Sequence, residues 1–486
     1  MPKIFINGRE VEAKAGSTVI EVARAQGHDI PCFCWHKSLS VAGNCRLCVV
    51  EAEEGGWLDI ACNMPVAEGL KVLTDSPKVK EHRQMMLELL TLNHPLDCGI
   101  CDKAGECKLQ DYYYEHNGAP SASVDKKVRL TKFVALNDRI VLDNERCVLC
   151  TRCVRFTHEV SKSHGLGIVG RGDHAMVRAA ENGAFASDAY SDNVVDLCPV
   201  GALQSRQFLA SSRVWYLTPT ASICPGCERG CNVDVWHRSY DWQLHALDAR
   251  KNVAIARVTP RDNAAVNGPW ICNKGRDLAQ LLDRPRATQA FVGGKAVATH
   301  DAVAAARKLI ERARRPLALL SSWASNEELA AFKTALGDRF TVRIKQDHAA
   351  TPGEVVQDDL LIRPDKNPNT AGARAAFPEA SPWSATFDAA ALHVQYDLVL
   401  VWGEGFDVAS VTDVPVVFLN AYDDARNAQA AVFLPVSSMT ERGGHYTNCD
   451  GQVGAFEACF DKPASVVHAQ ELFVELGVRV AEPMEA

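Results

Sequence analysis

The stretch Cys147-Val148-Leu149-Cys150-Thr151-Arg152-Cys153 places three cysteines within seven residues, and Cys198-Pro199 follows much later in the chain. Three thiolates at C-x2-C-x2-C spacing can bind three corners of one iron–sulfur cube, and a Cys-Pro can supply the fourth ligand. In two-cluster ferredoxins that Cys-Pro serves the other cluster, but no second C-x2-C-x2-C run follows here. Zinc sites more often combine two CxxC pairs, or Cys with His. The pattern therefore predicts one [4Fe–4S] cluster on Cys147, Cys150, Cys153 and Cys198, rather than zinc or buried thiols.

Length and composition limit the class of protein. A chain of 486 residues is expected to form several domains. The net charge of −8, from 52 Lys and Arg against 60 Asp and Glu, argues against a nucleic-acid-binding surface. The sequence has no apolar run of about eighteen residues and no apolar leader, so we expect neither a transmembrane helix nor a signal peptide. Of the 18 cysteines, only Cys449 and Cys459 lie beyond residue 273, which in a reducing cytoplasm predicts metal ligands in the first half.

Residues 1–77 predict a small β-grasp module. Asn7-Gly8 is a hairpin turn signal, and Thr18-Val19-Ile20-Glu21 is a capping box that opens a short helix. The next cysteines have C-x10-C-x2-C-x13-C spacing, which favours a [2Fe–2S] cluster over a zinc knuckle, although plant-type ferredoxins have a shorter first gap. The predicted ligands are Cys34, Cys45, Cys48 and Cys62. Cys32, two residues before the first ligand, is the expected non-ligand.

Residues 78–117 combine a helix with a second ligand set. The pattern predicts a helix over residues 79–92, with Met86, Leu89 and Leu90 on one side, that ends at His94-Pro95. The following H-x3-C-x2-C-x5-C spacing suits zinc and iron–sulfur chemistry equally when taken alone. Its place between two iron–sulfur modules favours a [4Fe–4S] cluster, and one imidazole ligand should raise its reduction potential. The predicted ligands are His94, Cys98, Cys101 and Cys107.

Two further segments complete the metal-binding half. In residues 118–215, a strand over 139–143 is expected before Cys147, and a helix is expected after Cys198, with Pro199 in its first turn. In residues 216–280, strands are expected over residues 240–255. Their C-x2-C-x3-C set and a remote cysteine again favour [4Fe–4S], with zinc as the alternative. The predicted ligands of this last site are Cys224, Cys227, Cys231 and Cys272.

Residues 281–486 alternate between helical and strand patterns. Helices are predicted over 302–314 and 326–336, and buried strands over 316–321, 340–345, 396–402 and 414–419. This order predicts a doubly wound α/β domain. Trp402-Gly403-Glu404-Gly405 follows a strand but lacks a full G-x-G-x-x-G fingerprint, so a tight turn is favoured over nucleotide binding. The segment has no P-loop and no evident hydrolytic triad, so no catalytic residue is assigned.

Together the four motifs resemble the large iron–sulfur subunit of respiratory complex I, NADH:quinone oxidoreductase (the G or 75 kDa type, in a short bacterial form), over residues 1–276. The resemblance implies one [2Fe–2S] and three [4Fe–4S] clusters on the residues named above. It leaves Cys32, Cys449 and Cys459 without a role. Residues 281–486 are similar to a shortened molybdopterin-oxidoreductase-like domain through residues 363–369 and 434–451. One lobe cannot hold both nucleotide-like halves of that cofactor, so molybdopterin is not expected.

The resemblance implies an electron conduit without a substrate site of its own. Electrons would come from a flavin and NADH-binding subunit and leave through quinone-side iron–sulfur subunits, at the cytoplasmic side of the inner membrane. The Cys224 cluster would lie off that path. An iron–sulfur subunit of a soluble NAD-linked formate dehydrogenase or hydrogenase is the main alternative. The absence of any cysteine between Cys272 and Cys449 argues against the former, and the length of the chain beyond residue 215 against the latter.

Overall fold

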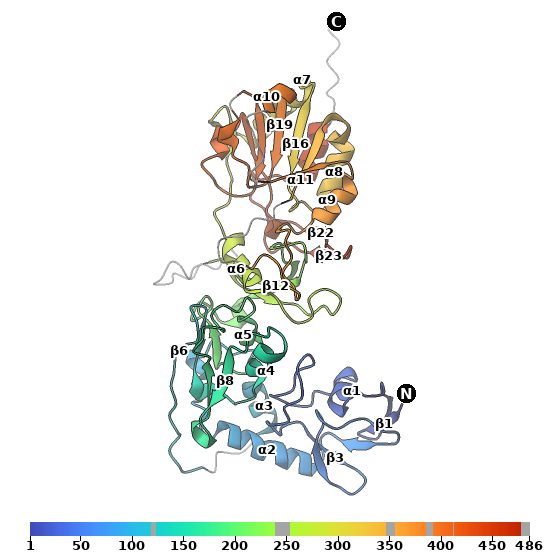
Figure 1. The fold of residues 1–486 in the computed structure, drawn as a ribbon, viewed down its shortest axis with the longest axis vertical. Coiled ribbons are helices and arrows are strands. Elements are labelled where there is room, and N and C mark those ends of the chain that lie inside the picture. The colour runs from blue at the N-terminus through green and yellow to red at the C-terminus, as the bar shows by residue number, and fades with distance from the viewer. Residues whose placement is uncertain (118–122, 239–252, 347–354, 385–391, 412, 478–486) are drawn as a thin grey trace. The chain divides into compact units, whose positions relative to one another are not determined.

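The computed structural model describes residues 1–117, 123–238, 253–346, 355–384, 392–411 and 413–477 (Figure 1). The chain forms two compact units, Met1–Leu217 and Thr218–Ala486, and each is described by itself. Within the described residues, no helix is long and apolar enough to cross a membrane.

The first module of the N-terminal unit is a mixed five-stranded sheet with strand order β2-β1-β5-β3-β4. The hairpin turn between its first two strands is formed by Asn7 and Gly8, both with positive φ (49° and 77°), as the sequence predicts. Helix α1 (Val19–Ala25) packs on the sheet and begins with the predicted capping box of Thr18 and Glu21. The strands are β1 (Lys3–Ile6), β2 (Arg9–Glu12), β3 (Val49–Ala52), β4 (Leu58–Ile60) and β5 (Lys71–Leu73).

The second module is built from helices α2 (Pro77–Thr91) and α3 (Lys108–His116). The long helix forms as predicted, but its buried side is not the predicted one. Val79, Arg83, Leu87 and Thr91, spaced four residues apart, are buried, whereas Leu89 is 57% exposed. The difference arises because the buried stripe includes an arginine, Arg83, whose guanidinium donates a hydrogen bond to the carbonyl oxygen of Val49 (3.3 Å).

The rest of this unit surrounds the cysteine-rich stretch with short strands. A three-stranded sheet has the order β10-β7-β6, and a separate hairpin pairs β8 with β9. The expected helix after Cys198 is absent: α5 (Asn193–Leu197) ends before this cysteine, and the following residues form turns that lead into β10. A helix does not form here because Leu203–Ser205 instead pairs as an antiparallel strand with β7. The elements are β6 (Val134–Ala135), β7 (Ile140–Leu142), α4 (Arg152–Glu159), β8 (Leu166–Val169), β9 (Met176–Ala179) and β10 (Leu203–Ser205).

The C-terminal unit begins with an antiparallel sheet of three strands, in the order β11-β12-β13, followed by helix α6 (Asn273–Leu282). Its strands are β11 (Thr218–Ile223), β12 (Asn232–His237) and β13 (Ile255–Pro260). Most of the strand content predicted over residues 240–255 lies outside the described residues.

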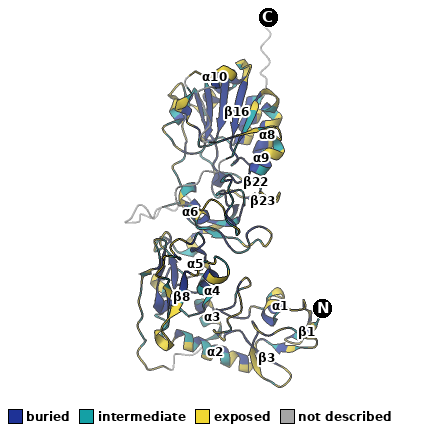
Figure 2. Ribbon diagram, in the orientation of Figure 1, coloured by how far each residue is buried: buried dark blue, intermediate teal, exposed yellow. Residues whose placement is uncertain are grey.

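An eight-stranded sheet with order β15-β14-β21-β20-β19-β16-β17-β18 forms the core of this unit (Figures 1 and 2). The six strands from β21 to β18 are parallel. Alternate residues of β19 point to opposite faces, so Leu398 and Leu400 join a core that is covered by helices, while Val399 and Val401 join the core of the other face. The strands are β14 (Ala290–Val292), β15 (Lys295–Val297), β16 (Pro316–Leu320), β17 (Thr341–Lys345), β18 (Ser381–Trp383), β19 (Leu398–Trp402), β20 (Val416–Asn420) and β21 (Val432–Pro435). The helices are α7 (Thr299–Arg312), α8 (Asn326–Leu336) and α11 (Ala469–Gly477).

Candidate metal centres

Cys34, Cys45, Cys48 and Cys62 are buried and lie together at one end of the β-grasp sheet. Hydrogen bonds from the thiols of Cys45 and Cys62 hold the pKa of Cys34 well below its usual range. The backbone N–H of Phe33 donates to the Cys45 sulfur (3.4 Å), and Arg46 curls the loop with a positive φ of 54°. Four converging sulfurs with amide donors around them fit a [2Fe–2S] cluster.

Cys32 has a different environment from the four predicted ligands. Its sulfur accepts a hydrogen bond from Arg24 Nη2 at 3.1 Å, and burial raises the pKa of its thiol. The same guanidinium lies over the Trp35 ring, 4.8 Å from its centroid. The arginine thus holds this sulfur in a contact of its own, in keeping with the predicted non-ligand.

The four cysteines of the opening motif line one small cavity. Leu149 and Thr151 have positive φ values of 49° and 61°, and these turns wrap the C-x2-C-x2-C loop around the cavity. Burial raises the pKa of Cys147 to about 12 and that of Cys150 to about 11. Thiolates in this pocket therefore need a cation to offset burial, so the donor set fits a metal cluster. The remaining wall is largely aliphatic and includes Leu142, Val177, Val200, Ala202 and Leu203.

The third set comprises His94, Cys98, Cys101 and Cys107, and the structure relates the cysteines to one another more clearly than to the histidine. Burial lowers the pKa of His94 to about 4, which leaves the imidazole neutral and able to ligate a metal. Cys101 interacts electrostatically with both Cys98 and Cys107. The groups that act on the pKa of His94 are instead Asp97 and the cations Arg146, Lys127 and Lys132. The structure therefore relates the three cysteines to one another, while the ligand role of His94 stays a prediction.

Cys224, Cys227, Cys231 and Cys272 form the fourth set, in the C-terminal unit. The backbone N–H of Cys224 donates to the Cys231 carbonyl oxygen (2.8 Å), so the C-x2-C-x3-C segment closes into a loop. Burial, together with the neighbouring Cys227, raises the pKa of Cys272 to about 11. Cys449 is exposed, unlike the four members of this set, whereas Cys459 is half-buried, as Cys272 is.

Among the described residues, no group of three or more His, Cys, Asp or Glu side chains has an arrangement that could hold a metal ion. The individual ligand assignments therefore remain predictions.

Two arginines of α4 connect the first and second cysteine sets. Arg155 donates hydrogen bonds to the carbonyl oxygens of both Cys34 and Cys150, and to that of Ser40. Arg152, which lines the cavity of the second set, donates to the carbonyl oxygen of Trp35 (2.6 Å). From the other side, Asn44 Nδ2 donates to the Leu149 carbonyl oxygen (2.9 Å). Side chains that donate to backbone carbonyl oxygens thus join the two ligand loops, a feature that cysteine spacing cannot reveal.

The second and third sets meet through a buried ion pair and a glycine. Asp97, which precedes Cys98, accepts two hydrogen bonds from Arg146, which precedes Cys147 (2.9 and 2.8 Å). The guanidinium of this arginine is almost fully buried. A Cβ on Gly201 would come closer than 3.0 Å to the Cys101 sulfur, so glycine alone permits this approach. Residues beside the ligands therefore hold these two sites together.

Four family models match the chain, and their order is that of the modules. They are the "2Fe-2S iron-sulfur cluster binding domain" (residues 2–77), the "NADH-ubiquinone oxidoreductase-G iron-sulfur binding region" (83–119), the "NADH-quinone oxidoreductase subunit 3, ferredoxin-like domain" (137–204) and the "Molybdopterin oxidoreductase Fe4S4 domain" (217–284). The G subunit of NADH-quinone oxidoreductase from Rickettsia conorii is 36% identical over 290 residues, and the NADH-ubiquinone oxidoreductase 75 kDa subunit of Reclinomonas americana is 38% identical over 286. The chain is a relative of the G subunit of NADH-quinone oxidoreductase.

The similarity to these two relatives covers part of each protein. It spans 59% of this chain, and 41% and 39% of the two relatives. A solved NAD+-reducing [NiFe]-hydrogenase chain is 30% identical over 44% of this chain and 91% of its own length, with a TM-score of 0.40. The matched modules bear iron–sulfur sites of both the 2Fe–2S and the 4Fe–4S kind.

The description of the fourth model names molybdopterin, so its fit can be tested on the C-terminal unit. The described residues form one doubly wound sheet. The large pocket beside this sheet is lined by no cysteine among the described residues. The pocket therefore offers no thiolate to a metal carried by such a cofactor, and we derive no chemistry through it.

Proposed function

We propose that this chain is an electron-transfer subunit of NADH:quinone oxidoreductase. It carries one [2Fe–2S] and three [4Fe–4S] clusters on the sixteen predicted ligands, without molybdopterin. Each cluster takes up and releases one electron, and the protein sets its spacing, burial and hydrogen bonding. The observation that carries the proposal is the chain of arginine hydrogen bonds that links the three cysteine sets of the N-terminal unit.

The connection supports a specific order of transfer. The first set is hydrogen-bonded to the second through Arg155, and the second lies against the third through Arg146 and Gly201. An electron that enters at the Cys34 site would pass to the Cys147 site and then to the Cys101 site. The Cys224 site belongs to the other compact unit, and we propose, from the resemblance alone, that it is not part of this path.

Exposed apolar side chains on α2 and on both sides of Cys98 support an exit there. Met85 and Leu89 lie on the outer side of α2 with 51% and 57% of their surface exposed, and Leu96 and Ile100 follow at 53% and 71%. Apolar surface that is exposed in this way is typical of a protein interface. We assign it to a quinone-side iron–sulfur subunit, and place the NADH-oxidising flavin subunit at the Cys34 side. The subunit would then be peripheral, at the cytoplasmic face of the inner membrane.

Metal analysis of anaerobically purified protein tests the cofactor content. About fourteen irons per chain with matching sulfide are expected from one [2Fe–2S] and three [4Fe–4S] clusters. Zinc at any site would refute the cluster at that site. Stoichiometric molybdenum or tungsten would instead favour a formate dehydrogenase.

Arg155→Met tests the relay itself within the assembled complex. The variant should retain its iron and its electron paramagnetic resonance signals, and should reduce an artificial acceptor that takes electrons from the flavin at the native rate. NADH:quinone turnover should fall, because the link between Cys34 and Cys150 is lost. Arg178→Met, at an exposed position of β9, is the matched control. Unchanged quinone turnover in Arg155→Met would contradict the proposed path.

A further inference from the structure

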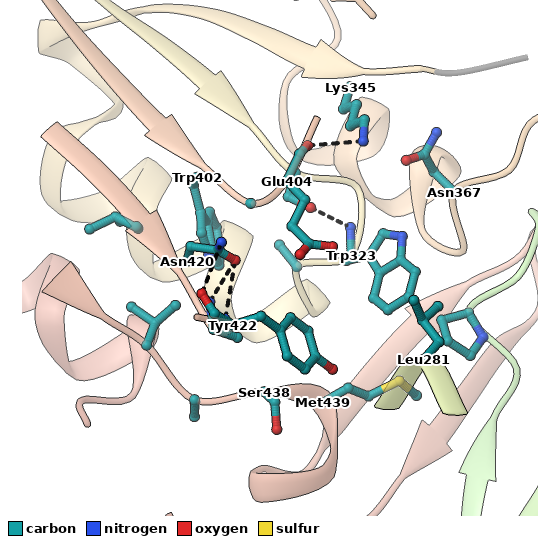
Figure 3. A pocket seen from close by; sticks show the side chains of 18 of the residues that line it. Leu281, Trp323, Lys345, Asn367, Trp402, Glu404, Asn420, Tyr422, Ser438 and Met439 are labelled. Atoms are coloured by element: carbon teal, nitrogen blue, oxygen red, sulfur yellow. Dashed lines mark hydrogen bonds between the residues drawn. The ribbon is translucent and has the colours of Figure 1, made fainter. Parts of the chain in front are cut away.

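A pocket in the C-terminal unit lies where the parallel strands end (Figure 3). The parallel strands lie in the order β18-β17-β16-β19-β20-β21. After β16 the chain adds β17 and β18 on one side of this strand, and then crosses to add β19 on its other side. In doubly wound sheets, ligands bind at this switch point, outside the carboxyl ends of the strands. Ser321 and Trp323 after β16, and Gly403 and Glu404 after β19, line the pocket. Its cavity volume is about 270 Å3, near the lower end of the range for small-molecule sites.

The wall of the pocket is cationic. Lys274, Lys345 and Lys366 line it, and Glu404 supplies a carboxylate. That carboxylate is already bound by both terminal nitrogens of Arg284, at 2.9 and 3.0 Å. A positive surface inside a partly closed pocket selects an anionic ligand.

The lysines are held by carbonyl oxygens of the surrounding loops. Lys366 Nζ donates to the carbonyl oxygens of Val356 (2.8 Å) and Arg363 (2.9 Å), and Lys345 Nζ donates to that of Glu404 (3.0 Å). Gly405 makes room for the latter, because a Cβ there would come within 2.7 Å of Lys345 Nζ. These bonds fix the ammonium groups in place without removing their charge. They therefore pre-position the groups for a phosphate.

Aromatic rings supply the other half of the recognition surface. Trp323 and Tyr422 face the cavity, with Leu281 and Met439 beside them (Figure 3). The guanidinium carbon of Arg284 lies 3.8 Å from the centroid of the Tyr422 ring. Flat apolar surfaces of this kind accept a heterocyclic base by stacking.

The start of helix α8 rules out one familiar phosphate position. Its N-terminus is closed by a capping box, in which Ser325 Oγ accepts from Glu328 N (3.2 Å) and the Glu328 carboxylate accepts from Ser325 N (2.8 Å). A carboxylate at this point repels a phosphate, so the glycine-rich mode of dinucleotide binding is excluded. Only the lysine side of the pocket remains for the anion.

We propose that this pocket binds a mononucleotide, with its base against Trp323 and Tyr422 and its phosphate at Lys345 and Lys366. The proposal goes beyond the electron-transfer function and does not depend on it. It also gives the turn at Gly403, after β19, a role as part of the pocket wall.

Calorimetric titration of the cluster-loaded, full-length chain tests the site. The probes are GMP and AMP, the nucleosides guanosine and adenosine, and inorganic phosphate. We expect saturable binding of at least one nucleotide, and binding of its nucleoside and of phosphate that is about tenfold weaker or more. No saturable binding of either nucleotide, or equally tight binding of phosphate alone, would overturn the proposal without any variant being needed.

Variants then locate the bound groups. Lys366→Met should weaken nucleotide binding by about tenfold to a hundredfold, because a charge-assisted contact is lost. Trp323→Leu should weaken binding of the nucleotide and of the nucleoside to the same degree. Lys308→Met, at an exposed position of α7, is the control and should bind as the native chain does. Native affinity in Lys366→Met, or stoichiometric molybdenum or tungsten in the pocket, would refute the assignment, whether or not the chain transfers electrons.

Discussion

Replacing Gly201 by alanine tests the contact between the second and third cysteine sets. A Cβ at this position would lie closer than 3.0 Å to the Cys101 sulfur and 3.2 Å from Lys103 Cβ, whereas ordinary contacts begin at 3.4 Å. The sulfur must therefore retreat by more than 0.4 Å, or the loop after Cys198 must move. Because Gly201 has no positive φ, the effect of the substitution is purely steric.

The cost should resemble that of other overpacked interiors, about 1–3 kcal/mol. For a unit of this size, such a loss lowers the melting temperature by roughly 2–12 °C. If Cys101 is a ligand, its displacement should also cost the cluster, so iron should fall by about four atoms per chain. Iron and sulfide analysis, electron paramagnetic resonance of the reduced protein and calorimetry measure the three effects.

Gly167→Ala provides the matched control for this change. Gly167 lies in β8 of the same unit, and a Cβ there would meet nothing within 4 Å. If Gly201→Ala kept full iron, native spectra and the melting temperature of the control, the proposed contact would be wrong. If stability fell while the iron content stayed native, Cys101 would be packed at this glycine without being a ligand.

Three further predictions concern other sites. Cys32→Ser should keep the [2Fe–2S] spectrum while Cys34→Ser loses it, as visible absorption can show, because Arg24 already holds the first of these sulfurs. Arg286→Met should lower the free energy of unfolding of the C-terminal unit in urea by about 3–5 kcal/mol, since the buried Glu441 loses a bidentate partner at 2.6 and 2.7 Å. A loss of less than about 1 kcal/mol, which is typical of an exposed ion pair, would contradict this prediction. Burial raises the pKa of Asp283 to about 6, so the folded state binds more protons than the unfolded state between about pH 4 and 6 and stability falls as pH rises through this window. Asp283→Asn should therefore stabilise the chain more at pH 8 than at pH 5, by about 1 kcal/mol after allowance for partial exposure, and an equal effect at both pH values would refute the shift.

Local sequence signals predicted much of the secondary structure. The capping box at Thr18 and the hairpin at Asn7 act within a few residues, so the structure reproduces both. Helix α8 has its predicted bounds, because Ser325 and Glu328 mark its start. The signals worked where the deciding interactions are between near neighbours in the chain.

The errors have a common physical cause in long-range pairing. The helix expected after Cys198 gave way to turns and a strand because residues 203–205 pair with β7, which is remote in sequence. The buried side of α2 includes Arg83 because its guanidinium reaches a carbonyl of β3. Neither partner can be identified from the periodicity of the segment itself. The pocket of the C-terminal unit was also missed, since strands distant in sequence contribute its lining.

The arginines explain why cysteine spacing alone describes these sites incompletely. Spacing identifies which thiols can share a cluster, but it does not say how far one cluster lies from the next. In this chain Arg146, Arg152 and Arg155 all come from the segment that carries Cys147, and they bind Asp97 and the carbonyl oxygens of Trp35 and Cys34. Each guanidinium offers several donors in a rigid plane, so one residue can hold two loops at a set separation. Their positive charge also offsets the negative charge of cysteine-ligated clusters. The same three residues would therefore influence both terms that govern electron transfer between neighbouring clusters, the distance and the difference in reduction potential.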